Sequence, residues 1–289
     1  MTELLRALAT LAEAPTDTSA RLGDLLDLDH EPTPVEYTEF FLFQQIPYAS
    51  VYLGAEGMVG GEARDRIAGF WRALSCEPPH EVDHLSTMLG AYADLCERHS
   101  AERQVGGGEQ WLKARHAFLW EHLLSWLPAY LHKARAIAPR PFDQWADLLM
   151  EAMLEEARDL PAATGLPMHL RDVPCVADPR HQGADDFIAA VLTPVRSGMI
   201  LTRADLLSAA RALHAGVGIA GRQSVLRTLI DQEPEATIGW LSVEASQWEQ
   251  FHAEQSADLG ALAGFWHERA AATRKLLHGL QHDIPSGRV

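Results

Sequence analysis

The chain has 289 residues, of which 47% are hydrophobic and 22% are charged, so it can bury a sizeable core and is not disordered as a whole. Its 24 Lys and Arg residues against 40 Asp and Glu residues give a net charge of −16. A surface this acidic repels phosphate, which excludes non-specific nucleic-acid binding and suits a partner with a basic segment. No run of about 18 apolar residues occurs, and the N-terminus lacks the basic start and apolar stretch of a secretory signal, so we expect no membrane insertion and a cytoplasmic protein.

Helical patterns begin at the N-terminus, and no stretch shows the alternation of a β-strand. The first expected helix has leucines on one side and follows Thr2, which we expect to cap it. Residues 14–32 are polar, acidic and contain prolines, so we expect a loose segment there. Thr33 and Glu36, with Pro34 between them, have the spacing of a capping box and predict a strong helix start.

Further helical patterns follow along the chain, separated by glycine- or proline-rich segments. Helices are expected at about 62–74, 85–96, 109–126, 128–137, 142–159, 185–192, 202–215 (with Thr202 as the cap and Asp205 in the box position), 222–231, 234–253 and 258–280. Glycines at 54–61 and 106–108 predict loops. The sequence therefore predicts an all-α protein with a core at 1–159, a Pro-rich linker at 160–184 and a helical C-terminal region at 185–289.

The three cysteines, Cys76, Cys96 and Cys175, are odd in number, and their spacing fits no zinc-binding pattern. We expect free thiols that are buried as small hydrophobic residues, in a reducing compartment.

Two Glu-x-x-His pairs, Glu81–His84 and Glu249–His252, place both side chains of a pair on one face of a helix, as in two-metal helical bundles. Glu121 is a candidate for one further ligand, and no candidate for the last one stands out. The structural alternative is that Glu81 stabilises a helix start and that His252 lies at the solvated surface. Because the ligand set is incomplete and nucleophile and phosphate-loop motifs are absent, we expect no cofactor, no bound metal and no enzyme activity, with a two-metal enzyme as the alternative.

Several short motifs match a known family in order and spacing. The segment Tyr37-Thr38-Glu39-Phe40-Phe41 is similar to an aromatic-x-x-Leu-Phe motif, and Asp83-His84-Leu85 matches the end of a Glu-Pro-x-Asp-His motif. Both motifs belong to the TorD/DmsD/NarJ family of cytoplasmic chaperones for molybdenum-containing oxidoreductases, which residues 37–127 therefore resemble. The chain departs from the second motif, since Glu77-Pro78 comes three positions early and Glu81 lacks the proline. Residues 47–54, 115–128 and 194–199 resemble a long-chain branch of this family.

The resemblance implies a TorD-like helical bundle with an additional helical C-terminal region, as a monomer or homodimer. It also implies a function, which is binding of the twin-arginine leader or the apo form of a molybdopterin oxidoreductase until its cofactor is inserted, before export or assembly. A leader of this kind has basic residues followed by an apolar helix, so its receptor needs acidic groups beside an aromatic groove. A helical interaction scaffold unrelated to metalloenzymes remains a further alternative.

The candidate leader site lies around the second motif. Glu81 and Asp83 are separated from Phe70 and Trp71 by a Pro-Pro turn, so we expect the acidic groups to lie next to this aromatic pair. His84 is a candidate hydrogen-bonding residue. In the structural alternative, Asp83 caps the following helix and His84 packs behind it. The further aromatic candidates are Tyr37, Phe41, Tyr48 and Tyr52.

Overall fold

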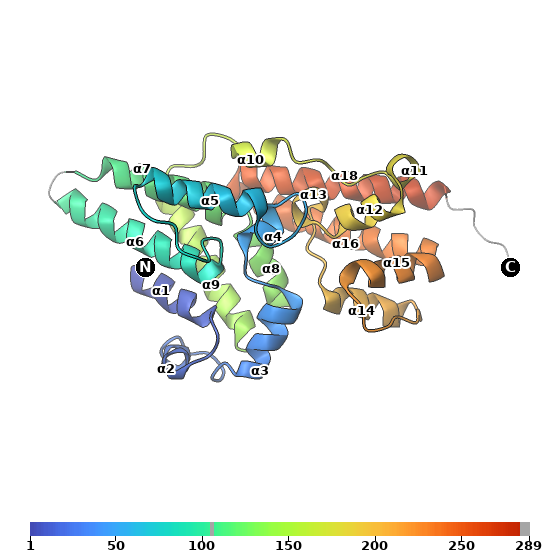
Figure 1. The fold of residues 1–289 in the computed structure, drawn as a ribbon, viewed down its shortest axis with the longest axis horizontal. Coiled ribbons are helices and arrows are strands. Elements are labelled where there is room, and N and C mark those ends of the chain that lie inside the picture. Colours follow the sequence, from blue (N-terminus) through green and yellow to red (C-terminus); the bar gives the residue numbers. More distant parts are fainter. Residues whose placement is uncertain (105–106, 284–289) are drawn as a thin grey trace. The chain divides into compact units, whose positions relative to one another are not determined.

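The computed structural model describes residues 1–104 and 107–283, so residue 106 of the expected loop at 106–108 lies outside the described part. The described residues form eighteen α-helices, two π-helical segments and no strand, which confirms the all-α fold (Figure 1). Within this part of the chain the only extended pairing is an isolated bridge between Tyr48 and His84. None of the described helices is long and apolar enough to cross a membrane.

The chain divides into two compact units. Unit 1 comprises Met1–Leu53 and Met58–Pro167, and unit 2 comprises Gly54–Gly57 and Met168–Val289. The division after Pro167 falls within residues 160–184, where the composition predicts a linker.

Unit 1 holds the first nine α-helices and both π-helical segments. Their bounds are α1 (Thr2–Leu11), α2 (Asp17–Leu25), α3 (Pro34–Tyr37), η1 (Thr38–Gln44), α4 (Ala49–Leu53), α5 (Gly61–Ala73), α6 (Leu85–Gln104), α7 (Glu109–Ala117), η2 (Phe118–Leu123), α8 (Leu127–Ile137) and α9 (Phe142–Asp159). In this unit α1 and α7 pack against α6, and α8 packs against α9.

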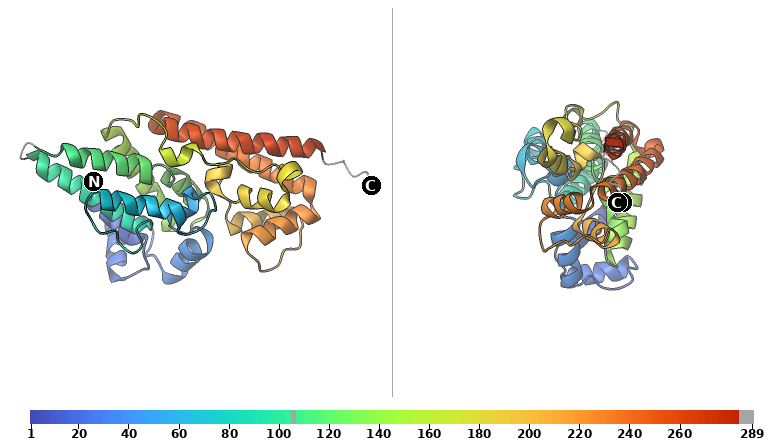
Figure 2. Two further views of the ribbon diagram at one scale, coloured as in Figure 1. Left: turned by 45° about the horizontal axis from the view of Figure 1, so that its top comes forward. Right: turned by 90° about the vertical axis from the view of Figure 1, so that its right-hand side faces the viewer.

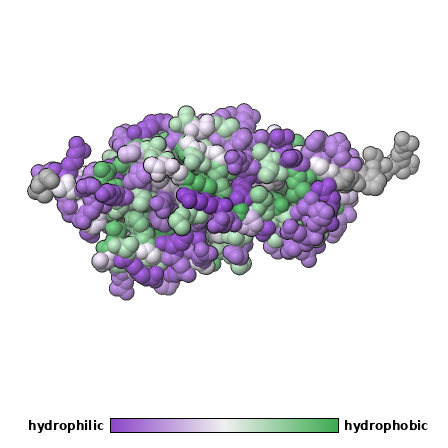
Figure 3. Space-filling view, turned by 90° about the horizontal axis from the view of Figure 1, so that it is seen from above, coloured by the Kyte–Doolittle hydropathy of each residue, from purple (hydrophilic) through white to green (hydrophobic). Residues whose placement is uncertain are grey.

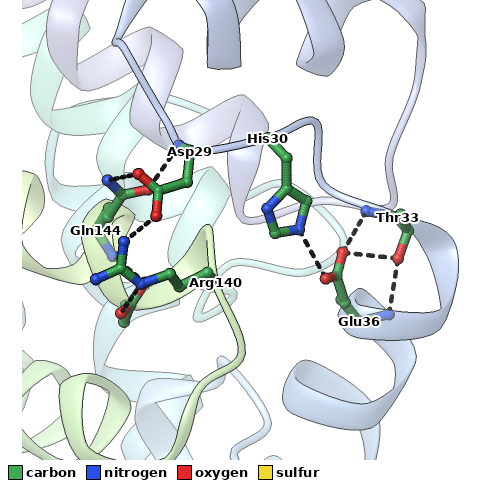
Figure 4. Close-up of polar contacts among 7 residues, drawn as sticks. Asp29, His30, Thr33, Glu36, Arg140 and Gln144 are labelled. Atoms are coloured by element: carbon green, nitrogen blue, oxygen red, sulfur yellow. Dashed lines mark hydrogen bonds and ion pairs between the residues drawn. The ribbon is translucent and has the colours of Figure 1, made fainter.

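The capping box at the start of α3 is confirmed, and Figure 4 shows its hydrogen bonds. The backbone N–H of Glu36 donates to Thr33 Oγ1 (3.3 Å), while the Thr33 N–H and hydroxyl donate to the Glu36 carboxylate (3.0 and 2.7 Å). Pro34 occupies the first helical turn, where its missing N–H is not needed.

The prediction of a loose segment at 14–32 is wrong. Helix α2 forms within it, because Thr16 and Ser19 build a capping box of their own. The end of the segment is also held in place, since the Asp29 N–H donates to Gln144 Oε1 (2.8 Å) and the Asp29 carboxylate pairs with Arg140 (Figure 4). Thr2 does not act as a cap either, because it is the first residue of α1 and no side chain caps this helix.

Helix α3 and η1 present one apolar side to the core and one to solvent. Phe40 and Phe41 are fully buried, whereas Val35, Leu42 and Phe43 are 77%, 53% and 63% exposed. Four consecutive apolar residues at 40–43 span most of a helix circumference, so the core cannot cover them all. We call Val35, Leu42 and Phe43 the outer strip.

His122 in η2 is buried between two aromatic rings, with ring centroids 5.4 Å from Phe70 and 5.5 Å from Phe118. Burial, with a smaller contribution from Arg66, lowers the pKa of His122 from 6.5 to about 4. The imidazole therefore stays neutral in the folded protein at pH values where it is protonated in the unfolded chain.

This difference predicts a pH dependence of stability. The folded pKa lies below the unfolded pKa, so the His122 contribution is complete above pH 6.5 and is lost as the pH falls towards about 4. Between pH 7.5 and pH 5 the loss should be about 2 kcal/mol in the free energy of unfolding. Urea unfolding of wild type and His122→Gln at both pH values measures it. The variant should show a smaller pH dependence by about this amount, and equal dependence in both proteins would contradict the prediction.

Unit 2 holds the remaining helices. Their bounds are α10 (Met168–Arg171), α11 (Pro179–Gln182), α12 (Ala184–Val191), α13 (Pro194–Ser197), α14 (Arg203–Ala212), α15 (Arg222–Gln232), α16 (Pro234–Glu254), α17 (Ser256–Leu259) and α18 (Ala261–Asp283). The capping box of Thr202 and Asp205 is confirmed at the start of α14. Helices α16 and α18 lie side by side and form the most extensive helix pair in the described residues (Figures 1 and 2).

Three local predictions in or near this unit are corrected by the structure. The expected helix at 258–280 is interrupted at Gly260, which has a positive φ of 51° and separates α17 from α18. His252 is 3% exposed rather than solvated, because α18 covers its side of α16 and its Nε2 hydrogen-bonds the carbonyl of Gly198 (2.9 Å). All three cysteines are free, but only Cys96 is buried, whereas Cys76 is half-buried and Cys175 is exposed.

Charged and polar residues predominate on the surface that Figure 3 draws. On the face drawn in Figure 3, hydrophilic residues cover most of the area and hydrophobic residues form smaller areas between them. Scattered apolar residues of this kind are normal on a protein surface, so only a contiguous exposed group on one element needs an explanation.

Candidate functional site

Two family-like blocks of the sequence meet in unit 1. The Ala49 N–H donates to the Asp83 carbonyl (2.9 Å), and the Leu85 N–H donates to the Pro47 carbonyl (2.8 Å). These two bonds form a short antiparallel pairing with Tyr48 opposite His84. The Tyr48 and His84 rings consequently contact each other edge to face, with centroids 4.9 Å apart.

Asp83 is a buried cap, but not of the helix that follows it. Asp83 is only 1% exposed, and its carboxylate accepts a hydrogen bond from the Ser50 N–H (3.3 Å) in the first turn of α4. The structural alternative placed this cap on α6, so it named the right kind of role and the wrong helix. A carboxylate buried in this way is not open to an arginine of a peptide.

His84 serves the start of α6. It is 8% exposed, and its Nδ1 lies 2.8 Å from Ser86 Oγ and accepts the Ser86 N–H at 3.3 Å. Burial lowers the pKa of His84, although the nearby carboxylates of Glu81, Glu13 and Asp83 act in the opposite direction. A neutral imidazole fits this arrangement.

Two exposed carboxylates, those of Glu81 and Glu13, accept hydrogen bonds from residues in or next to the Tyr48–His84 pairing. Tyr48 donates its hydroxyl to Glu81 Oε1 (2.6 Å), and Ser86 donates its hydroxyl to Glu13 Oε1 (2.8 Å). Burial raises the pKa of Tyr37, and the charges of Glu13 and Glu81 raise it further, so the Tyr37 hydroxyl lies in the field of both. We call Glu13, Glu81, Tyr37, Tyr48 and His84 the acidic cluster.

Glu81 is not at a helix start, as the structural alternative assumed. It lies in the turn that precedes α6, where its carboxylate is exposed to solvent. Neither Glu13 nor Glu81 is paired with a Lys or Arg in the described part of the chain. Since each carboxylate offers about four acceptor positions and uses one, both keep acceptor positions free for a guanidinium group.

The aromatic candidates Phe70 and Trp71 lie elsewhere on unit 1. They line a hollow of about 30 Å³. Its lining also includes Leu74, Asp94, Arg98 and Trp111. The Trp71 indole N–H is buried and has no hydrogen-bond partner among the described residues. Arg98 lies over the Trp111 ring, 4.9 Å from its centroid.

Neither Glu81 nor Asp83 is among the residues that line the hollow at Phe70 and Trp71. After α5 the chain turns back, so that the His80 carbonyl accepts a hydrogen bond from Arg64 (2.9 Å) near the first turn of α5. Trp71 lies near the last turn of the same helix, about 10 Å further along its axis. Sequence proximity across the Pro-Pro turn therefore did not mean contact.

Phe41 and Tyr52 are core residues. Phe41 packs edge to face against Phe142 and Trp145, with centroids 5.1 and 5.5 Å away. Tyr52 stacks on Trp126 (5.2 Å) and donates its hydroxyl to the Ile46 carbonyl (2.9 Å). Both are buried, so neither presents a surface to a peptide.

Sequence reasoning missed Glu13. This residue lies two positions after the end of α1, and the packing of α1 against α6 brings it to Ser86, 73 positions further along the chain. No spacing rule in the sequence signals such a contact, because both residues look like ordinary polar positions near helix ends.

The two-metal alternative finds no support in the described residues, which contain no group of three or more His, Cys, Asp or Glu side chains able to hold a metal ion. Glu249 is engaged with Arg274 (2.5 Å), and the His252 Nε2 is engaged with a backbone carbonyl.

Comparison with known proteins gives one family match and several similar chaperones. Residues 2–132 match the family described as nitrate reductase delta subunit. Proteins named Chaperone protein TorD from two strains of Vibrio vulnificus are each 29% identical over an alignment of 136 residues, which covers 44% of this chain and 63% of theirs. The protein of that name from Vibrio parahaemolyticus is 24% identical over 156 residues, 51% of this chain and 70% of its own.

The chain thus spans somewhat less than two thirds of the length of the Vibrio vulnificus relatives. No solved structure matches. The residues that match the family lie almost entirely in unit 1, which also carries the acidic cluster and the outer strip.

Proposed function

We propose that the protein is a cytoplasmic maturation chaperone for a molybdopterin-containing oxidoreductase, because residues 2–132 match a family model and the chain is similar to proteins named Chaperone protein TorD. It binds the twin-arginine leader of that enzyme and holds the apoenzyme until the cofactor is inserted. The relatives' name supports a binding protein rather than an enzyme. The observation that carries the proposal is the pair of exposed carboxylates, Glu13 and Glu81, that no basic residue of unit 1 neutralises.

The chemistry of the acidic cluster fits arginine. A guanidinium group donates in a planar fork, and its hydrogen bonds to carboxylates are of the strong, charge-assisted kind. Tyr48 and Ser86 each hold one oxygen of a carboxylate, which orients Glu81 and Glu13 without neutralising them. The net charge of −16 also attracts a basic leader over a longer range, and salt weakens this attraction.

The outer strip is the surface that receives the apolar part of the leader. Leu42 and Phe43 in η1 come five and six positions after Tyr37, the last residue of α3 and a member of the acidic cluster. A leader whose apolar stretch directly follows its arginines covers this distance with a few residues.

Replacing both exposed carboxylates should weaken leader binding strongly. We expect Glu13→Gln/Glu81→Gln to lose about 1–3 kcal/mol, which is a 5- to 150-fold lower affinity for a peptide with two arginines and an apolar stretch. The salt dependence of binding should flatten, because two charges that meet the arginines are gone. Calorimetric titration at low and high salt measures both effects. Leu42→Ser/Phe43→Ser in the same titration should weaken binding of this peptide and leave a peptide without the apolar stretch unaffected.

The matched control is Glu151→Gln/Glu155→Gln, which makes the same change of charge on the exposed side of α9. This variant should bind as wild type does. If the acidic-cluster variant also binds as wild type at both salt concentrations, the cluster is not the leader site. If wild type binds a peptide with both arginines changed to Gln equally well, the interaction scaffold becomes the better description.

A further inference from the structure

A pair of histidines on α18 has no part in the function proposed above. His278 and His282 are one helical turn apart, and their rings meet at a centroid distance of 4.6 Å. Their Nε2 atoms lie 3.4 Å from each other, and both side chains are exposed. Of the other described residues, none forms an ion pair with either imidazole.

The separation of the two nitrogens matches the geometry of a metal site. Imidazole nitrogens bind Zn²⁺ at about 2.0–2.1 Å in tetrahedral coordination. The two Nε2 atoms are 3.4 Å apart. An ion at about 2.0–2.1 Å from both of them therefore makes an N–Zn–N angle of about 110°. This is close to the tetrahedral angle, so the separation of the two nitrogens suits a shared ion.

We propose that His278 and His282 form a binding site for Zn²⁺ in which water completes the coordination. In the absence of metal one imidazole shares a proton with the other, and the ion replaces this proton. The described residues provide no third His, Cys, Asp or Glu ligand, so the ion exchanges with solvent and is not a resident cofactor.

The position of the pair gives the site a structural consequence. An ion that links two side chains one turn apart holds that turn in the helical conformation, since it binds the folded helix better than the unfolded chain. Helix α18 packs along α16, so this stabilisation acts on the largest helix pair of unit 2. Lys275 lies one turn before His278 in the sequence, and its positive charge opposes the binding of a cation there.

The test is calorimetric titration of ZnCl₂ into the full-length protein in a buffer that does not chelate metals. We expect one Zn²⁺ per chain whose binding weakens at least 10-fold in His278→Gln and in His282→Gln. His80→Gln, which changes an exposed histidine outside any such pair, should bind as wild type does. Zn²⁺ should also raise the midpoint of thermal unfolding of wild type and not of His278→Gln/His282→Gln, while Mg²⁺ should raise neither.

Two results would overturn the assignment. One is Zn²⁺ binding with unchanged stoichiometry and affinity in the double variant, which would place the ion elsewhere. The other is no binding to wild type, which would leave the pair as two surface histidines that share a proton. The single, double and control variants all change exposed histidine side chains. Circular dichroism should therefore report the same helix content in all of them and in wild type.

Discussion

Gly198→Ala is expected to destabilise unit 2 by about 3–5 kcal/mol. Gly198 has a positive φ of 76°, which costs about 1–2 kcal/mol for a residue with a side chain. A Cβ at this position would lie 2.3 Å from the Ala270 nitrogen and 2.8 Å from its Cα. These are backbone atoms of α18, which cannot move away without breaking the contact between Gly198 and the helix.

The surrounding hydrogen bonds explain why this approach is so close. His252 Nε2 lies 2.9 Å from the Gly198 carbonyl, and Thr273 donates its hydroxyl to the Ser197 carbonyl at 2.8 Å. The turn after α13 is thereby held against both α16 and α18. A shift that accommodates the new methyl group would break at least one of these buried bonds, at about 1–3 kcal/mol.

Urea unfolding followed by tryptophan fluorescence and circular dichroism measures the effect. The matched control is Gly264→Ala in α18, where a Cβ would meet no atom within 4 Å. This change should stabilise the protein by about 0.5–1 kcal/mol, because alanine is the better helix former. Equal stability of the two variants would show that the backbone approach at Gly198 is not tight.

Glu156→Gln is expected to lower the free energy of unfolding of unit 1 by about 3–5 kcal/mol. Glu156 on α9 is buried, and its Oε2 accepts a hydrogen bond from the Tyr92 hydroxyl (2.5 Å) and pairs with Arg115 on α7. Arg115 also donates to the Tyr92 hydroxyl (3.2 Å), so the three side chains form one closed network. Removing the negative charge leaves the largely buried guanidinium of Arg115 uncompensated.

A rescue experiment separates the lost charge from a merely local change of shape. Arg115→Met/Glu156→Gln removes both charges and should recover most of the stability, because a neutral pair no longer needs compensation. Glu155→Gln, the exposed neighbour on α9, should change the free energy of unfolding by less than about 0.5 kcal/mol. If Glu156→Gln behaves like Glu155→Gln, the network does not stabilise unit 1.

Cys96 lies next to the same network. Its Sγ lies 3.9 Å from Glu156 Oε2, and burial raises the pKa of this thiol to about 11. The structure thus separates the three free cysteines by environment, with Cys175 exposed and Cys96 neutral and buried. The odd number in the sequence only indicated that they are not all paired.

The sequence by itself determined those features whose cause is local. The capping boxes of Thr33 with Glu36 and Thr202 with Asp205 were predictable, because both partners lie three residues apart in one helical turn. The helical class followed from periodic apolar positions and the absence of strand alternation. The resemblance to the TorD family rested on motifs of this local kind, and the N-terminal match confirms it.

Only the tertiary structure decided which surface each of these residues occupies. Glu13 joins Glu81 because α1 packs against α6, His252 is buried because α18 covers it, and Trp71 is separated from Glu81 because the chain turns back along α5. Each outcome depends on contacts between residues far apart in the chain, and such contacts form wherever they bury the most apolar surface and leave the fewest polar groups unpaired. A pattern within one helix predicts which side is buried, but the partner that buries it is chosen by the packing of the whole unit.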